Sequence, residues 1–289
     1  MMRLPTVLLN GKKLPRIIFS ISPANGFGLM KKVYAMGITH FDLPSLRHLV
    51  RFRELKRWAE DENLVGLCHL EAEEGISFLG KPLHRFETKV ISTIKKNLDL
   101  PHSVRNLSHV PVASEVFTQK EIDRMAFDSQ RFEKALSLFN PRESPFLFLG
   151  ERYGDWLLAL GRIDLLKQMI ARVREKGFAP VYSGQWATFS LPKAKSLEVV
   201  AYAVPINKRG SLFDLEQACT LIKKFDRPVI SLNPLADGTL MKNSEEAFSF
   251  LFKELKITLA IAEIHSEPEA EILLCAADQI PSLIPPRKA

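Results

Sequence analysis

Eight short runs of apolar, largely β-branched residues recur along this chain of 289 residues, and longer amphipathic segments separate most of them. Strands that are apolar on both faces must be covered on both faces, which is typical of parallel sheets made of alternating strands and helices. The runs are residues 16–20, 39–43, 64–70, 145–149, 179–182, 198–203, 228–232 and 258–261. Eight such units predict a TIM (β/α)8 barrel that forms one domain over residues 1–289.

A doubly wound parallel sheet is the alternative fold, because its strand–helix units have the same local pattern. Its usual signature is a Gly-x-Gly-x-x-Gly turn directly after the first strand. The corresponding loop here, residues 25–28, reads Asn-Gly-Phe-Gly and lacks the third glycine. The sequence therefore favours the barrel.

Two segments depart from the alternation. Residues 7–14 predict a β-hairpin around Asn10-Gly11, a pair that favours the type I′ turn. Residues 72–144 are too long for a single crossover and contain helical patterns at 84–98 and 118–139, the second of which opens with a capping box. We expect a mostly helical insertion after the third strand that forms a lid over one end of the barrel.

Composition excludes several classes of protein. With 46% hydrophobic residues the chain can bury enough surface to fold, and no stretch approaches the roughly 18 apolar residues of a membrane span. The first residues also lack the apolar core of a signal peptide. The net charge of +7 includes a basic run at 47–57 whose arginines predict the exposed side of a helix, so no nucleic-acid partner is expected. Three widely spaced cysteines indicate a reducing cytoplasm.

Several segments resemble the aldo/keto reductase superfamily. Residues 9–16 are similar to the hairpin that closes the barrel bottom in that family, and residues 35–42 to its second strand, which ends in a catalytic aspartate. Residues 228–240 resemble the seventh strand with its Pro-Leu-Ala-x-Gly loop, and residues 257–278 the eighth strand and its phosphate-facing helix. The resemblance implies an NADP(H)-dependent oxidoreductase that acts on a small carbonyl substrate.

The active site implied by the resemblance is altered. The family uses an Asp, a Tyr five residues later as proton donor, a Lys on strand three that lowers the Tyr pKa, and a His on strand four. Here Asp42 is present, but Arg47 followed by His48 occupies the Tyr position, and strand three offers His69 instead of a lysine. Strand four has no histidine, and Glu263 replaces a glycine near the cofactor phosphate, which a carboxylate repels. We expect Asp42, Arg47, His48 and His69 to be the catalytic residues.

Polar residues at the carboxyl ends of the other predicted strands are the candidate cofactor ligands. They are Ser183, Gln185, Asn233, His265 and Ser266. An alternative cofactor is a divalent transition metal, because residues two apart in a strand point the same way and could present imidazoles and carboxylates together. The ligands of that metal would be His69, Glu71, Glu263 and His265. A cofactor-free small-molecule enzyme, or a non-catalytic scaffold whose insertion binds a partner, are the other functions the sequence leaves open.

Overall fold

The computed structural model describes residues 4–22, 26–97, 115–210, 214–278 and 280. Eight strands form a closed barrel in which neighbouring strands are parallel. In barrel order they are β3 (Ile17–Ile21), β4 (His40–Leu43), β5 (Val65–Glu71), β9 (Phe146–Gly150), β10 (Ala179–Ser183), β11 (Ala201–Pro205), β12 (Val229–Leu232) and β13 (Leu259–Ile264). Each overlaps one of the eight apolar runs, so the predicted TIM barrel is confirmed.

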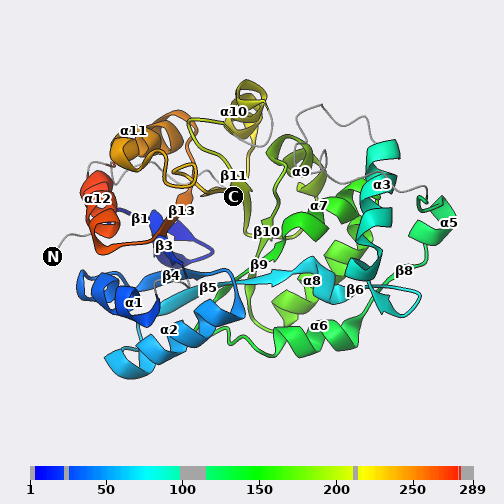
Figure 1. Ribbon diagram of the computed structural model, residues 1–289, viewed down its shortest axis with the longest axis horizontal. Helices are drawn as coiled ribbons and strands as arrows, with labels where there is room; N and C mark the ends of the chain where they lie inside the picture. The colour runs from blue at the N-terminus through cyan, green and yellow to red at the C-terminus, as the bar shows by residue number, and fades with distance from the viewer. Residues whose placement is uncertain (1–3, 23–25, 98–114, 211–213, 279, 281–289) are drawn as a thin grey trace.

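Helices surround the barrel as a ring (Figure 1). They are α1 (Gly26–Ala35), α2 (Leu46–Ala59), α7 (Glu151–Ala159), α8 (Ile163–Glu175), α9 (Ala187–Ala194), α10 (Leu215–Lys224), α11 (Ser244–Ser249) with the π-helical turn η5 (Phe250–Glu254), and α12 (Glu267–Asp278). None of the described helices is both long and apolar enough to cross a membrane. Followed in chain order, the helices run counterclockwise in Figure 1. Because β–α–β crossovers are right-handed, this view looks onto the carboxyl ends of the barrel strands.

The strands separate two hydrophobic cores. One core lies between the sheet and the helices and contains alternate strand residues such as Phe19, Cys68 and Leu147. The other fills the barrel and includes Ile18, Leu67, Phe146, Phe148, Val181, Ala201, Ala203, Ile230, Leu259 and Ile261. Burial of both faces explains why the strands read as continuous apolar runs without polar alternation.

A hairpin closes the end of the barrel where the strands begin. It consists of β1 (Thr6–Leu9) and β2 (Lys12–Pro15), which pair antiparallel. Asn10 and Gly11 have φ values of 48° and 74°, as the predicted type I′ turn requires. Leu9 and Leu14 are buried in the core inside the barrel. The hairpin therefore seals this end and leaves the carboxyl ends of the strands for chemistry.

The insertion between β5 and β9 combines a small sheet with helices. The strands β6 (Ile76–Phe78), β7 (Lys81–Pro82) and β8 (Met125–Phe127) form an antiparallel sheet in the order β7-β6-β8. The helices are α3 (Glu87–Asn97), α5 (Gln119–Ile122) and α6 (Ser129–Leu136), with 3-10 turns η2 (Ala72–Gly75) and η3 (Leu83–Phe86). The described part contacts α7 and α8 at the side of the barrel (Figure 1), and residues 98–114 lie outside the described ranges. The role of residues 72–144 as a lid stays a prediction.

The small sheet corrects one expected helix. The pattern at 118–139 predicted continuous helix, but the chain forms α5, then β8, then α6. The capping box is confirmed, because the backbone N–H of Glu121 donates to Thr118 Oγ1 and that of Thr118 donates to Glu121 Oε2. Pairing of β8 with β6 overrides the helical period between the two helices. Arg162 fixes this corner by donating to the carbonyls of Ile122 and Met125 at 2.6 and 2.7 Å.

Candidate functional site

Polar side chains replace the apolar filling of the barrel at the carboxyl ends of four adjacent strands, β13, β3, β4 and β5. Ser20 follows the interior residue Ile18 by two positions, so its side chain also faces the interior. Ser20 is in register with Asp42 on one side and Glu263 on the other. His69 faces the interior on β5 by the same two-residue step. These four residues form what we call the polar crescent.

His69 connects the crescent to a third carboxylate, that of Glu151. Its Nε2 lies 2.7 Å from Asp42 Oδ1 and its Nδ1 lies 3.1 Å from Glu151 Oε1. The imidazole also stacks on Phe148, with ring centroids 4.6 Å apart. Since a carboxylate only accepts hydrogen bonds, both ring nitrogens of His69 must carry protons to make these two contacts.

The charge on His69 is set by competition between burial and its two neighbours. The side chain is only 7% exposed, and burial alone would lower the imidazole pKa. The charges and hydrogen bonds of Asp42 and Glu151 outweigh burial and raise the pKa of His69 to about 10. His69 is therefore protonated, and positively charged, at neutral pH.

A sharp turn after β9 brings Glu151 to His69. Gly150 has a φ of 131° and Glu151, the first residue of α7, has a φ of 51°. A Cβ atom on Gly150 would lie 2.5 Å from the carbonyl oxygen of Ser183. Only glycine fits this close approach of β9 to β10. Glu151 was not among the residues predicted from the sequence, and its partner His69 is 82 positions away in the chain.

His48 is the neutral imidazole of the site. It is buried on α2, its Nδ1 lies 2.8 Å from Ser45 Oγ, and its ring donates to the carbonyl of Ile21. Burial lowers the pKa of His48 in spite of the nearby charges of Asp42 and Glu263, which raise it. His48 thus approaches the polar crescent as the sequence suggested, whereas Arg47 is exposed on the first turn of α2. A catalytic role for Arg47 stays a prediction.

A buried carboxylate that the sequence reasoning missed organises the loop after β10. Asp155 Oδ1 accepts the hydroxyls of Tyr182 at 2.7 Å and Ser190 at 2.5 Å. Its Oδ2 accepts the backbone N–H groups of Gln185 and Trp186 at 2.7 and 3.0 Å. Burial raises the pKa of Asp155 to about 6, although the four donors act in the opposite direction. Asp155 therefore holds the segment that carries Gln185 and follows Ser183, two of the predicted cofactor ligands.

Asn233, another predicted ligand, stabilises its own loop after β12. Its Oδ1 accepts the backbone N–H of Asp237 at 2.7 Å, and its Nδ2 donates to Asp237 Oδ1 at 2.9 Å. Asn207 Nδ2 donates to the Asn233 carbonyl at 3.1 Å. The Pro-Leu-Ala-x-Gly loop is thus closed by side chains of the chain itself.

The first turn of α12 is also capped from within. The backbone N–H of His265 donates to Glu269 Oε2 at 2.7 Å, and Ser266 Oγ accepts the N–H of Glu269 at 3.4 Å. Glu267 forms an ion pair with Lys32 at 2.6 Å. Carboxylates of α12 therefore occupy the helix end next to Glu263, in the region where the resemblance implied a phosphate.

The metal alternative is not supported by the arrangement of its four proposed ligands. His69 uses both ring nitrogens for carboxylates, while Glu71, Glu263 and His265 are exposed. Throughout the ranges that the structure describes, no three His, Cys, Asp or Glu side chains are grouped in a way that could hold a metal ion. His69 and Glu71 both belong to β5, whereas His265 lies beyond the end of β13, so the i, i+2 spacing does not bring the four side chains to a common centre.

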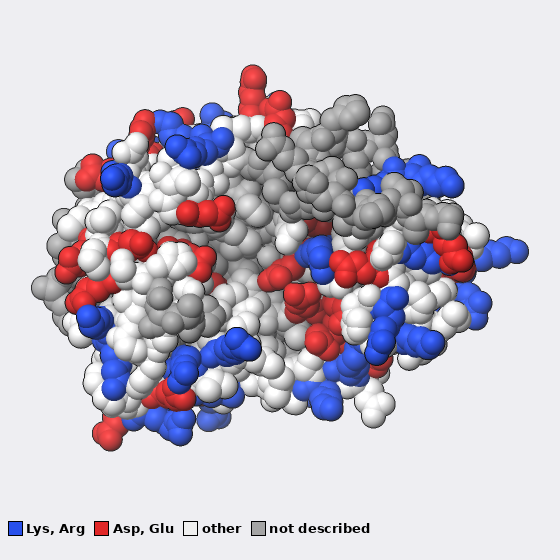
Figure 2. All heavy atoms as spheres, in the orientation of Figure 1, with Lys and Arg blue, Asp and Glu red and all other residues white. Residues whose placement is uncertain are grey.

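The face that carries the site is hollowed at its centre, and acidic side chains gather around the hollow (Figure 2). Lysines and arginines lie mostly toward the periphery of the same face. The negative charges affect one another at Glu71. The pKa of Glu71 is raised by burial and by the charges of Glu151, Glu73 and Glu74, while the charge of Arg152 acts in the opposite direction. The net charge of +7 is therefore carried outside the barrel mouth, which is acidic.

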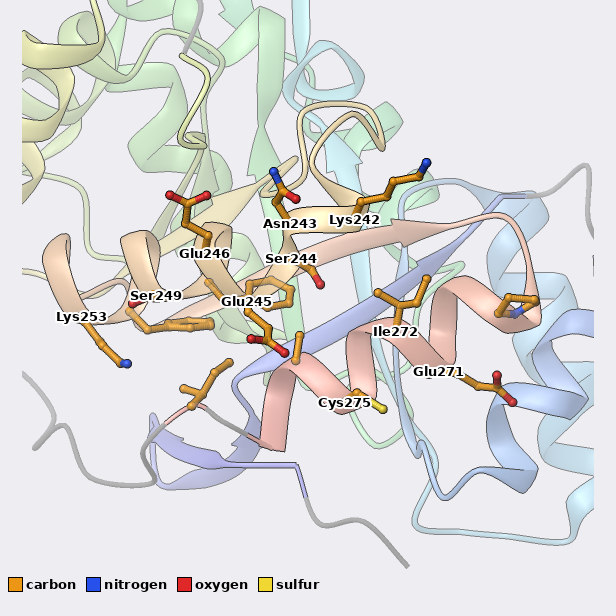
Figure 3. Close-up of a pocket in the computed structure, with 15 residues that line it drawn as sticks. Lys242, Asn243, Ser244, Glu245, Glu246, Ser249, Lys253, Glu271, Ile272 and Cys275 are labelled. Atoms are coloured by element: carbon orange, nitrogen blue, oxygen red, sulfur yellow. The ribbon is translucent and has the colours of Figure 1, made fainter.

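A separate groove of about 1070 Å³ runs along the outside of the barrel between α11 with η5 and α12 (Figure 3). Its lining includes Lys242, Glu246, Lys253, Glu271 and Cys275. None of the predicted site residues lines it. This groove lies among the outer helices, and the barrel mouth is the candidate functional site.

No protein-family model and no curated protein matches the chain, but solved structures do. A putative aldo-keto reductase from Pseudomonas aeruginosa has a TM-score of 0.55 and 12% identity, covering 95% of this chain and 94% of that one. An aldo-keto reductase from Bacillus halodurans in its holo form has a TM-score of 0.58 and 11% identity over 96% and 92% of the two chains. A thermostable aldo-keto reductase, solved with the inhibitor epalrestat, has a TM-score of 0.56 and 11% identity over 94% of each chain. The chain therefore has the barrel fold of the aldo-keto reductases.

Proposed function

We propose that this chain, on its aldo-keto reductase barrel, is a small-molecule enzyme that moves a proton next to a carbonyl group. The observation that carries the proposal is the cation His69, held between Asp42 and Glu151 at the carboxyl ends of the strands. A fixed positive charge at this place would stabilise the negative charge that develops on a substrate oxygen. The position on strand three is the one where the family resemblance implies a lysine, so the charge is retained although the residue type differs.

The two contacts of His69 suggest separate roles for its partners. The contact with Asp42 is shorter, and the Asp42 side chain is only 4% exposed. The contact with Glu151 is longer and Glu151 is 29% exposed, so a substrate oxygen can replace it at Nδ1 of His69. The displaced Glu151 carboxylate then accepts the proton from the carbon next to the carbonyl, while the oxygen becomes an enolate bound to His69. Asp42 keeps the imidazole oriented and charged.

The residues at the start of α12 bear on NADP(H), the cofactor that the resemblance implied. A dinucleotide binds there through phosphates, which require backbone N–H groups or cations. The His265 N–H is taken by Glu269, Lys32 is paired with Glu267, and Glu263 adds negative charge. These residues do not fit the phosphates, so the proposed reaction contains no hydride step. Ser183, Gln185, Asn233, His265 and Ser266 remain predicted ligands without an assigned group.

The proposal is tested by solvent deuterium exchange. The protein is incubated in D2O with a panel of small aldehydes and ketones, and loss of the signal of the hydrogen next to the carbonyl is followed by NMR. We expect exchange with the wild-type protein, and a rate about 100-fold lower for Glu151→Gln and for His69→Gln. Glu267→Gln, on the outer helix, should keep the full rate. Saturable oxidation of NADPH by the same compounds, without deuterium exchange, would instead establish a reductase and overturn the proposal.

The cellular setting is part of the same proposal. Cys68, Cys219 and Cys275 are all free thiols. The Cys68 thiol is buried in the outer core and donates a hydrogen bond to Ser144 Oγ at 3.0 Å. Burial raises the pKa of this thiol to about 12. Unpaired cysteines are typical of a reducing compartment, which supports the cytoplasm as the location.

A further inference from the structure

We infer that the exposed face of α2 binds the anionic surface of a lipid bilayer. The helix packs its buried residues His48, Leu49, Phe52 and Leu55 toward β4 and β5 of the barrel. Its opposite face carries the basic run at 47–57 that stands out in the sequence. The inference does not depend on the proposed reaction, which uses the barrel mouth.

Exposed apolar side chains are concentrated on this face of α2. Leu46, Val50 and Trp58 are 50%, 54% and 52% exposed. Because an α-helix turns by about 100° per residue, these three positions lie on one side of it. The other two tryptophans, Trp156 and Trp186, are buried. Large apolar side chains gathered in this way on a surface indicate a contact with a partner.

Cations lie among these apolar side chains. Arg47, Arg51 and Arg57 are exposed and project from the same side of α2. Lys31 of α1 extends the basic area, since its Nζ lies 4.5 Å from the centre of the Trp58 ring. Figure 2 shows lysines and arginines gathered over α1 and α2. These four cations and the three exposed apolar residues form what we call the α2 patch.

The positive charge of the α2 patch is not balanced within the protein. Glu54 is the only carboxylate in α2, and it pairs with Arg51 at 2.8 Å. Arg47 and Arg57 form no ion pair with any residue that the structure describes. The acidic residues 60–62 follow the end of the helix. The patch therefore attracts a partner that is itself anionic.

The combination of side chains favours a lipid surface as that partner. A helix that lies in a membrane interface presents Lys and Arg together with Trp and aliphatic side chains. The long stems of Lys and Arg carry the charge to lipid phosphates, while the apolar residues between them enter the boundary of the acyl chains. A second copy of this chain is disfavoured, because a symmetric contact would bring two basic patches together.

The inference is tested by the binding of the full chain to phosphatidylcholine vesicles with and without phosphatidylserine. Trp58 is the reporter, because water reaches it whereas the other two tryptophans are buried. We expect sedimentation and a blue shift of tryptophan emission only with phosphatidylserine, quenching of that emission by brominated lipid, and loss of binding in high salt. Trp58→Phe should abolish the blue shift, while the protein still sediments with the vesicles.

Two variants of the α2 patch separate charge from apolar contact. Arg57→Gln should lower the partition coefficient about fivefold, and Val50→Asp about tenfold. Lys167→Gln on α8 and Leu8→Asp on β1 are the matched controls, because both residues are exposed on other elements, and both variants should bind as the wild type does. Thermal unfolding of each variant establishes that it is folded.

Several results would overturn the inference. Equal binding to vesicles with and without phosphatidylserine, unchanged Trp58 emission in the bound protein, or equal losses in the control variants would each do so. Absence of sedimentation would overturn it as well, and a saturable Trp58 shift with poly-glutamate would then assign the patch to an acidic protein. Because these measurements use no substrate, their outcome is independent of the deuterium-exchange test.

Discussion

The Nε2 atom of His69 lies 2.7 Å from Oδ1 of Asp42, across the ladder between β5 and β4. The two residues are 27 positions apart in the chain, and parallel pairing of their strands makes them neighbours. Both side chains are almost fully buried, so neither is screened by water. This pair fixes a positive charge at the barrel mouth, and several consequences can be measured.

Replacing His69 by Gln should destabilise the fold. The substitution leaves the buried carboxylate of Asp42 without a counter-charge, which costs about 3–5 kcal/mol in comparable buried pairs. Urea denaturation at pH 7 measures the change in the free energy of unfolding. As a control, Lys208→Gln breaks the exposed Lys208–Glu246 pair and should have little effect. Equal effects of the two substitutions would contradict the buried ion pair.

The stability of the protein should depend on pH through His69. The pKa of His69 is about 10 in the folded protein, compared with 6.5 for an unperturbed imidazole. Because the folded pKa is the higher one, the stabilisation is complete below pH 6.5 and is lost as the pH rises through 10. We expect the free energy of unfolding to decrease across this interval more steeply for the wild type than for His69→Gln. Parallel pH profiles of the two proteins would show that His69 is not charged in the fold.

Asp155→Asn should destabilise the loop after β10. The carboxylate accepts four donors, whereas an amide offers one oxygen and adds an N–H group that cannot accept. At least one buried donor loses its partner, at a cost of about 1–3 kcal/mol. Asp214→Asn is the matched control, because Asp214 caps α10 at an exposed position where Asn caps equally well. Chemical denaturation of both variants gives the comparison, and a similar small loss in each would refute the role assigned to Asp155.

Gly150→Ala should impair both the fold and the site. Its Cβ atom would meet the Ser183 carbonyl at 2.5 Å, so β9 and β10 must separate and Glu151 must move away from His69. Gly161→Ala provides the control, since Gly161 also has a positive φ, 75°, but nothing lies within 4 Å of its Cβ position. We expect a clearly larger drop in melting temperature for Gly150→Ala, together with a shift of the His69 imidazole resonance. An equal drop in melting temperature in both variants would mean that the positive φ angle alone, and not the contact with the Ser183 carbonyl, causes the loss of stability.

The sequence by itself determined the barrel. Short apolar runs buried on both faces require helices on the outside of a sheet, and the pair Asn10-Gly11 specifies its hairpin turn through local backbone geometry. The family resemblance also selected Asp42 and His48, which the structure places near each other, while their catalytic role stays a prediction. Such features depend on contacts between residues close in the chain or on the period of a single element, and these are readable from the sequence.

Only the tertiary structure decided which charged groups meet at the barrel mouth. Glu151 and Asp155 begin or lie within α7, and nothing local distinguishes them from solvent-exposed helical acids. They are selected by residues on other strands, His69 on β5 and Tyr182 on β10, after barrel closure. Likewise, β8 forms only because β6 is beside it. Burial and charge of a side chain depend on neighbours distant in the chain, so the cation at the mouth and its acidic surroundings follow from the closed barrel alone.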